Sequence, residues 1–367
     1  MKILFITNSY PTLTHPTRQV FVKNIRNEME FQGHTTDLIF NNLFKSSQRF
    51  TSRKNIAVKA VKALGLIFSI IFNIRKCFKS DVIFSHAILF PTFYAVCLKP
   101  IHKKRVVCYV HGGDLNLFIN KKGILKRLMV FSLKKADKVI ANSRDINDKI
   151  RKLGIADNKL FTVPPGVNLT LMTELNKKTE LKSRLGLYNK FVLLCVGNAI
   201  HRKGHDQLLR CIKSLNEKQK EIPIHLILVT EGPELSKYKE YIDTNNLTDR
   251  VTINPFVEQQ KLVEIYNTAD VFVFPSREEP LGLAAIEAMA CGLPVIGADV
   301  GGIREVTNNG AGFLYEPENI YDLGNKIEMV YRKDYDLKKN EIAMKKKVQQ
   351  YSLKENVQQM IKILEVE

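Results

Sequence analysis

The stretch from position 272 to 298 limits the possible folds more than any other feature of this 367-residue chain. Four consecutive apolar residues at 271–274 predict a short buried strand, since strands of parallel sheets are apolar on both faces. A polar loop follows, and a helix with apolar spacing begins near Leu283. The turn from Gly292 to Pro294 ends that helix before the next apolar strand. The stretch therefore predicts a β-α-β unit of a parallel α/β sheet.

Two acidic residues, Glu279 and Glu287, stand eight positions apart in this unit. Glu279 lies in the loop after the first strand, and Glu287 lies in the helix. Open α/β sheets bind ligands at the carboxyl ends of their strands. A carboxylate at this place can bind both hydroxyls of a ribose, while amides at the helix start can face a phosphate. The alternative is an ordinary β-α-β unit with two solvated glutamates.

The spacing of Glu279 and Glu287, followed by the run AMACGLPV at 288–295, resembles the signature of the retaining GT-B glycosyltransferases of family 4. The resemblance implies an α/β fold of two Rossmann-like domains that face each other across a cleft. It also implies that the last helix crosses back to the N-terminal domain. The implied activity is transfer of a sugar from a nucleotide sugar, with retention at the anomeric carbon and with no metal or cofactor. A UDP-sugar is favoured as donor, and a GDP-sugar is the alternative.

The resemblance assigns roles around the signature. Glu287 binds the ribose, and Glu279 acts as a catalytic residue at the donor sugar together with donor-binding positions Leu281, Gly282 and Leu283.

A second loop, at 197–204, follows an apolar strand at 191–196. In the family this loop places a basic pair on the donor diphosphate. Lys203 matches the lysine before a glycine, whereas Asn198 stands where the family usually has arginine. Arg202 can supply the missing charge. Positive charge is needed here because the departing nucleoside diphosphate develops negative charge. Lys203 is thus a catalytic and donor-binding candidate, and Asn198 and Arg202 are donor-binding candidates.

The first half of the chain supplies the remaining candidates. A strand expected at 105–110 ends in His111 and two glycines, which allow close approach to a ligand. The resemblance places His111 near the reacting carbon of the donor sugar, and a capping or core histidine is the alternative. The expected acceptor-side residues are Arg18 and His86. Arg18 lies in a first loop that lacks the family's usual glycine, and His86 is at the end of the strand expected at 79–86. A structural role for His86 stays open.

The predicted organisation has four parts. A proline-glycine turn at 164–166 marks the boundary between domains. We expect an N-terminal acceptor-binding domain at 1–168, a linker at 169–190, a nucleotide-sugar-binding domain at 191–345 and a returning helix at 346–367.

Charge is distributed unevenly along the chain. Residues 1–170 contain 29 Lys and Arg against 9 Asp and Glu, whereas residues 171–367 contain 27 against 28. This asymmetry favours an anionic partner for the first half. The segment 56–78 predicts a basic apolar helix that is too short to span a bilayer but suited to a membrane interface. Packing of this helix on the N-terminal sheet is the alternative.

The opening segment 9–24 resembles bacterial enzymes that build surface polysaccharides. Together with the basic first half, it favours a lipid-linked glycan acceptor. The chain is then expected in the cytoplasm, peripheral on the inner face of the cell membrane. Six scattered cysteines without a CxxC pair agree with a reducing compartment.

Other function classes are weaker. A nucleotide-sugar epimerase or a phosphorylase can share the two-domain fold. A nucleic-acid-binding protein is disfavoured, because the basic residues are not interleaved with stacking aromatics and the chain has no tryptophan. Asp334 and Asp336 have the letters of a DxD metal motif, but they lie in a lysine-rich segment without a preceding strand, so we expect no metal site.

Overall fold

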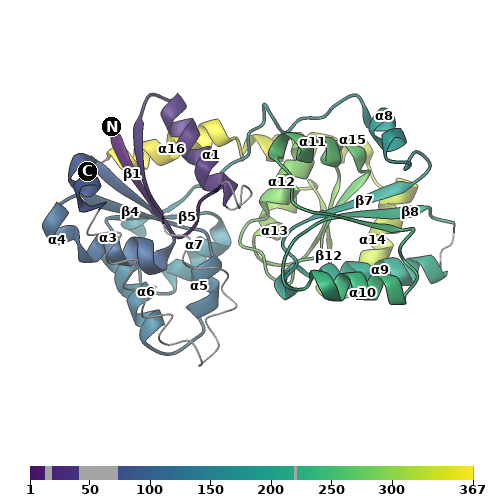
Figure 1. Ribbon diagram of the computed structural model, residues 1–367, viewed down its shortest axis with the longest axis horizontal. Coiled ribbons are helices and arrows are strands. Elements are labelled where there is room, and N and C mark those ends of the chain that lie inside the picture. The colour runs from purple at the N-terminus through teal and green to yellow at the C-terminus, as the bar shows by residue number, and fades with distance from the viewer. Residues whose placement is uncertain (13–18, 41–72, 219–220, 367) are drawn as a thin grey trace. The chain divides into compact units, whose positions relative to one another are not determined.

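The computed structural model describes residues 1–12, 19–40, 73–218 and 221–366. These residues form two compact units, Met1–Gly166 with Leu353–Glu367, and Val167–Ser352. Each unit is a parallel α/β sheet with helices on both faces, as Figure 1 shows. The prediction of two Rossmann-like domains is therefore confirmed.

The first unit is built on a six-stranded sheet in the order β2-β1-β3-β4-β5-β6, and every pair is parallel. The order reverses between β1 and β3, which are neighbours in register from Ile3 opposite Val82. The strands are β1 (Lys2–Thr7), β2 (Thr35–Phe40), β3 (Val82–His86), β4 (Arg105–Val110), β5 (Lys138–Ala141) and β6 (Leu160–Thr162). The helices include α1 (Val20–Phe31), α3 (Phe93–Cys97), α4 (Lys99–His102), α5 (Gly113–Phe118), α6 (Ile124–Lys135), α7 (Arg144–Arg151) and α16 (Leu353–Glu365).

The C-terminal helix α16 belongs to this first unit. Its buried residues Leu353, Val357, Met360 and Leu364 recur at the spacing of one helix face. They pack in one apolar cluster with residues of α1 and of the sheet, and Figure 1 shows α16 in yellow beside α1. The expected return of the last helix to the N-terminal domain is confirmed.

The second unit has a six-stranded parallel sheet in the order β12-β11-β10-β7-β8-β9. Apolar clusters lie on both of its faces, one with α11, α12, α13 and α15, the other with α9, α10 and α14. The strands are β7 (Phe191–Val196), β8 (Ile224–Val229), β9 (Val251–Asn254), β10 (Val271–Phe274), β11 (Val295–Ala298) and β12 (Phe313–Tyr315). The helices are α8 (Lys178–Arg184), α9 (His205–Lys218), α10 (Leu235–Thr244), α11 (Gln259–Thr268), α12 (Leu283–Ala290), α13 (Gly301–Thr307), α14 (Ile320–Arg332) and α15 (Leu337–Gln349).

The order in which the chain adds strands to this second sheet reverses between β7 and β10. Strands β8 and β9 extend from one side of β7, and β10, β11 and β12 extend from the other. The carboxyl ends of two such strands, at the point where the order reverses, are where open α/β sheets bind ligands. The loops after β7 and β10 carry the predicted donor residues.

The segment expected as a linker, 169–190, is an integral part of the second unit. It contains α8, and Leu181 and Leu187 are buried. The Lys182 ammonium pairs with Asp270 across 2.5 Å. The described boundaries therefore lie at Gly166 and Ser352 rather than at the predicted ends of a linker.

Most of the expected basic helix 56–78 lies outside the described residues, and its described part, residues 73–78, is helical. Within the part of the chain that the structure describes, no helix combines the length and apolar character needed to cross a bilayer.

Candidate active site

Lys203 and Glu279 meet where the order of the second sheet reverses. Lys203 lies in a short turn after β7, and Glu279 lies in the loop after β10. The Lys203 ammonium donates a hydrogen bond to Glu279 Oε2, and the two side chains are only 14% and 11% exposed. The Phe274 ring centroid is 5.1 Å from the ammonium, which adds a cation–π contact. The two catalytic candidates of this unit therefore form one partly buried pair.

Three glycines let the backbone approach this pair closely. Gly204 has φ +67°, and a Cβ there would lie 1.9 Å from the Pro275 carbonyl oxygen. Gly301 has φ +43°, and a Cβ there would lie 2.3 Å from the Glu279 carbonyl oxygen. The Gly302 amide donates to that same oxygen at 2.9 Å. Close backbone packing thus fixes the course of the loop that carries Glu279.

Glu287 is held by a tyrosine on the preceding helix. The Tyr266 hydroxyl, on α11, lies 2.9 Å from Glu287 Oε2 and 3.2 Å from the Ala284 carbonyl oxygen. Burial raises the pKa of Glu287 to about 7, although the hydrogen bond from Tyr266 opposes this rise. The Glu287 carboxyl therefore titrates near neutral pH.

The start of α12 separates these two carboxyls. Leu281 is buried, Gly282 caps the helix with φ +97°, and Leu283 is its first residue. A Cβ on Gly282 would lie 2.6 Å from Ile303 Cδ1, so glycine suits this cap for both its space and its backbone angle. The unpaired amides of a helix start can bind an anion.

The other two donor-binding candidates, Asn198 and Arg202, are exposed in the loop after β7. The Arg202 carbonyl oxygen accepts a hydrogen bond from the Arg277 amide at 2.8 Å. The loop that carries Lys203 is therefore tied to the loop that carries Glu279 by backbone as well as by side chains.

In the first unit, His86 and His111 form a stacked pair at the ends of β3 and β4. His86 Nδ1 lies 3.1 Å from His111 Nε2, and the ring planes are 25° apart. His86 is 1% exposed and His111 is half-buried. Burial lowers the pKa of His111 to about 3, and burial with the neighbouring His111 lowers the pKa of His86 well below its usual value. Both rings are therefore neutral at physiological pH.

The surroundings of His86 favour a structural role for this histidine over contact with the acceptor. Its ring lies among the aromatic rings of Phe5, Phe84 and Tyr109. Its Nε2 is buried and has no hydrogen-bond partner among the described residues. Arg18, the other acceptor-side candidate, lies outside the described residues.

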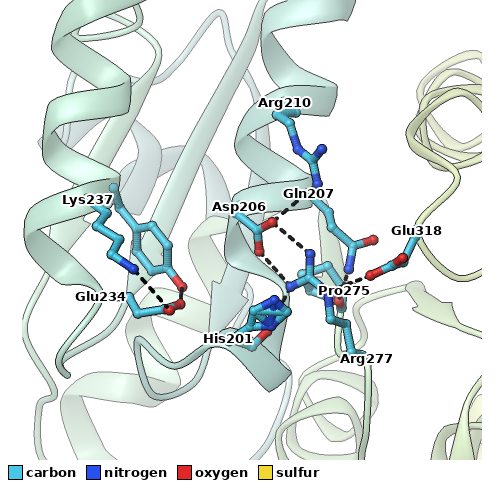
Figure 2. Close-up of polar contacts among 10 residues, drawn as sticks. His201, Asp206, Gln207, Arg210, Glu234, Lys237, Pro275, Arg277 and Glu318 are labelled. Carbon is cyan, nitrogen blue, oxygen red and sulfur yellow. Dashed lines mark hydrogen bonds and ion pairs between the residues drawn. The ribbon is translucent and has the colours of Figure 1, made fainter.

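Two residues near the predicted site had no role in the sequence analysis. Tyr266 contacts Glu287 from another helix, 21 positions earlier, so no local motif marks the pair. Arg277 forms a bidentate ion pair with Asp206, and Figure 2 shows its guanidinium between Asp206, Glu318 and the His201 backbone. The position of Arg277, two residues before Glu279 in the same loop, is the signal that could have drawn attention to it.

A separate polar cavity of about 790 Å³ lies in the second unit and contains none of the predicted site residues. Its lining comes from 174–180, Ser183, Asn267, Cys291 and Gly292. Cys291 and Gly292 follow the C-terminal end of α12, whereas Glu279 and Gly282 precede its start. The cavity is therefore distinct from the candidate active site.

No cluster of three or more His, Cys, Asp or Glu suited to a metal ion occurs among the described residues. Asp336, of the DxD-like letters, instead caps α15 by accepting a hydrogen bond from the Lys339 amide at 2.9 Å.

Two family models match the chain. The model described as "Glycosyl transferases group 1" matches residues 177–359, and that described as "Glycosyltransferase Family 4" matches residues 19–171. The chain belongs to the family 4 glycosyltransferases. The resemblance drawn from Glu279, Glu287 and the run after them is confirmed.

Curated relatives in this glycosyltransferase family align over part of their length. A D-inositol 3-phosphate glycosyltransferase of Thermobifida fusca is 34% identical over 202 residues, which cover 52% of this chain and 46% of that protein. A mannosylfructose-phosphate synthase of Agrobacterium fabrum is 30% identical over 214 residues, which cover 56% and 46%. The chain thus spans about half the length of the curated relatives it matches.

A solved structure shares the fold over nearly the whole chain. Anabaena Alr3699/HepE in complex with UDP superposes with a TM-score of 0.80 at 19% identity, covering 99% of both chains. The same Anabaena protein was also solved with UDP-glucose, with the same TM-score. This likeness shows that the present chain has the GT-B fold.

Proposed function

We propose that this chain transfers a sugar from a nucleotide sugar, preferably a UDP-sugar, to a hydroxyl of a glycan acceptor, with retention at the anomeric carbon. One observation carries the proposal. The Lys203–Glu279 pair lies at the carboxyl ends of β7 and β10, and Glu287 follows in the helix after β10. The names of the relatives and the UDP and UDP-glucose complexes of the Anabaena protein support the same class of donor.

Each group of the donor has a chemically suited partner. The Glu287 carboxylate can accept hydrogen bonds from both ribose hydroxyls. The start of α12, with Leu281, Gly282 and Leu283, offers amides, and Glu279 offers acceptor oxygens to the sugar hydroxyls. Lys203 balances the diphosphate charge, with Arg202 and Asn198 beside it on the same loop.

The Lys203 ammonium pairs with Glu279 in the structure. A bound diphosphate competes with Glu279 for the ammonium, and sugar hydroxyls replace the ammonium as hydrogen-bond donors to Glu279. The pair therefore satisfies both charges until the donor arrives, which avoids leaving either one buried and unpaired.

The proposed reaction breaks the bond between the anomeric carbon and the β-phosphate oxygen. A new bond forms from the acceptor oxygen to the same face of that carbon, and the acceptor proton passes to the departing phosphate. Lys203 stabilises the negative charge that develops on the diphosphate. We propose that His111, as a neutral ring, contacts the donor sugar near the reacting carbon.

For the acceptor we propose a lipid-linked glycan in surface polysaccharide biosynthesis. The basic composition of residues 1–170 supports an anionic carrier, such as a pyrophosphate-linked lipid at a membrane surface. We correspondingly propose a cytoplasmic, peripheral location at the inner face of the cell membrane, with Arg18 on the acceptor side and His86 as the buried partner of the His111 ring.

Calorimetric titration with UDP and with GDP tests the donor part of this proposal. We expect micromolar binding of UDP, weaker binding of GDP, and loss of binding in Glu287→Ala. Binding of neither nucleotide, or an unchanged affinity in Glu287→Ala, contradicts the proposal. Consumption of a UDP-sugar without an added acceptor would instead indicate the epimerase alternative.

A further inference from the structure

Arg277 is bound on several sides in the loop after β10. Its guanidinium donates to both carboxylate oxygens of Asp206 at 2.7 Å, to Glu318 Oε1 at 2.7 Å and to the His201 carbonyl oxygen at 2.8 Å. Its side chain is only 17% exposed. These partners come from the turn after β7, the start of α9 and the segment before α14, and Figure 2 shows them around the Arg277 guanidinium.

The backbone of Arg277 strengthens the same connection. The Arg202 carbonyl oxygen accepts from the Arg277 amide at 2.8 Å, and the Glu278 amide lies 3.4 Å from the same oxygen. Arg277 therefore binds two successive carbonyls of the turn, through its side chain and its amide. Lys203 is the next residue of that turn, and Glu279 stands two positions after Arg277.

Two further contacts hold the same loops. Gln207 Nε2, on α9, lies 3.4 Å from the Pro275 carbonyl oxygen. Gly204 packs so closely against that carbonyl that any Cβ would clash with it. Arg277 is thus the charged centre of a contact region in which the two loops run side by side.

The bidentate ion pair of Arg277 with Asp206 is better suited to orient the two loops than to increase the free energy of unfolding. Exposed ion pairs contribute little to the free energy of folding. A bidentate arginine–carboxylate contact, in contrast, fixes both groups in one plane, and four N–H groups of Arg277 are used here. The hydrogen bonds from Arg277 to Asp206, followed by those to Glu318, raise the pKa of the guanidinium, which remains charged.

We propose that Arg277 is a positioning residue that holds the Glu279 loop against the Lys203 turn, so that both side chains meet the donor in the correct relative placement. This inference rests on the proposed function, because it assigns Lys203 and Glu279 to the donor. Arg277 itself acts through these two residues rather than through contact with the donor.

The test is a double-mutant cycle of UDP affinity with the full-length chain. We expect Arg277→Met to weaken UDP binding about tenfold and Lys203→Met at least as much. Because Arg277 acts through Lys203, the double variant should bind UDP no more weakly than Lys203→Met alone. Arg277→Lys, which keeps the charge but loses the bidentate contact, should lie between wild type and Arg277→Met.

Arg332→Met is the matched control, because Arg332 is exposed and pairs with Glu328 on its own helix, α14. Its UDP affinity should equal that of the wild type. A thermal unfolding curve for each variant separates loss of affinity from loss of fold. If Arg277→Met does not fold, Asp206→Asn replaces it in the cycle, with the same expected result.

The possible outcomes distinguish the two proposals. If Lys203→Met weakens binding but Arg277→Met binds UDP like the wild type, the positioning role is wrong and the proposed function stands. Losses that add in the double variant also overturn the positioning role. A wild-type chain that binds neither UDP nor GDP overturns the proposed function and this inference together.

Discussion

The hydroxyl of Tyr266 lies 2.9 Å from Oε2 of Glu287, and this hydrogen bond joins α11 to the signature helix α12. Burial raises the pKa of this carboxyl to about 7, and the hydrogen bond from Tyr266 opposes the rise. The protonation of Glu287 therefore changes within the physiological range, and the neighbouring hydroxyl affects where it changes.

We predict that UDP binding strengthens as the pH rises through 7. The ribose hydroxyls need an acceptor carboxylate, and below pH 7 Glu287 is mostly protonated. If only the ionised form binds, affinity falls by about tenfold per pH unit below the pKa. Calorimetric titrations from pH 5.5 to 8.5 measure this slope. Glu287→Gln is the control, because any pH dependence it retains belongs to the nucleotide.

The contribution of Glu287 to the free energy of unfolding should decrease as the pH rises, in contrast to the UDP affinity. The pKa of Glu287 is higher in the folded state than its ordinary value of 4.5, so folding favours the protonated form. Its contribution is fully present below pH 4.5 and is lost as the pH rises through about 7. Comparing urea unfolding of wild type and Glu287→Gln at pH 5 and pH 8 isolates this contribution. A difference between the two proteins that is the same at both pH values would contradict the raised pKa.

For Tyr266→Phe, we predict a shift of the UDP-binding pH profile to higher pH. The hydroxyl stabilises the ionised carboxylate, so its removal leaves burial to raise the pKa of Glu287 further. The affinity at pH 8.5 should approach that of the wild type, whereas the affinity at pH 7 should fall severalfold. An equal loss at every pH would point to a packing defect instead.

For Lys203→Ala, we predict a loss of donor affinity of about tenfold and a larger loss in turnover, of about 100-fold or more. The variant removes the charge that balances the diphosphate and leaves Glu279 unpaired in a partly buried site. Steady-state kinetics with a UDP-sugar and a product assay measure both quantities. Lys213→Ala is the control, because Lys213 is exposed and pairs with Glu217 on its own helix, α9.

His111→Ala should reduce turnover while leaving UDP affinity unchanged. The role proposed for this ring concerns the donor sugar, which UDP lacks. Because burial lowers the pKa of His111 to about 3, the rate of the wild type should show no step from its titration between pH 5 and 8. A weakened UDP affinity in His111→Ala would contradict the assigned role.

Gly302→Ala should destabilise the second unit by about 1–3 kcal/mol. A Cβ at Gly302 would lie 2.4 Å from the Pro280 carbonyl oxygen and 2.5 Å from Leu281 Cα, both backbone atoms of the Glu279 loop. Gly324→Ala is the matched control. Gly324 lies within α14, and its added Cβ would be in ordinary van der Waals contact with Leu215 Cδ2 on α9, at 3.5 Å. There the gain in helix propensity should make the change neutral or slightly stabilising. Thermal unfolding of both variants checks the difference.

The sequence by itself determined the element types and the family. Apolar runs such as 191–196 and 271–274 predict strands because a local run of apolar residues is typical of a strand that a parallel sheet buries on both faces. The signature around Glu279 and Glu287 lies within a single β-α-β unit, so its geometry could be read from spacing alone. The return of α16 to the first unit could be expected only because the family resemblance implied it.

Only the tertiary structure decided which side chains meet. Lys203 and Glu279 are 76 positions apart, and they pair because β10 lies beside β7 in the sheet. Likewise, β3 beside β4 brings His86 to His111. Strand order is a non-local property that depends on packing of the whole unit, and spacing along the chain does not contain it. For the same reason, burial in the second unit, rather than local composition, made the polar segment 169–190 part of a domain instead of a linker.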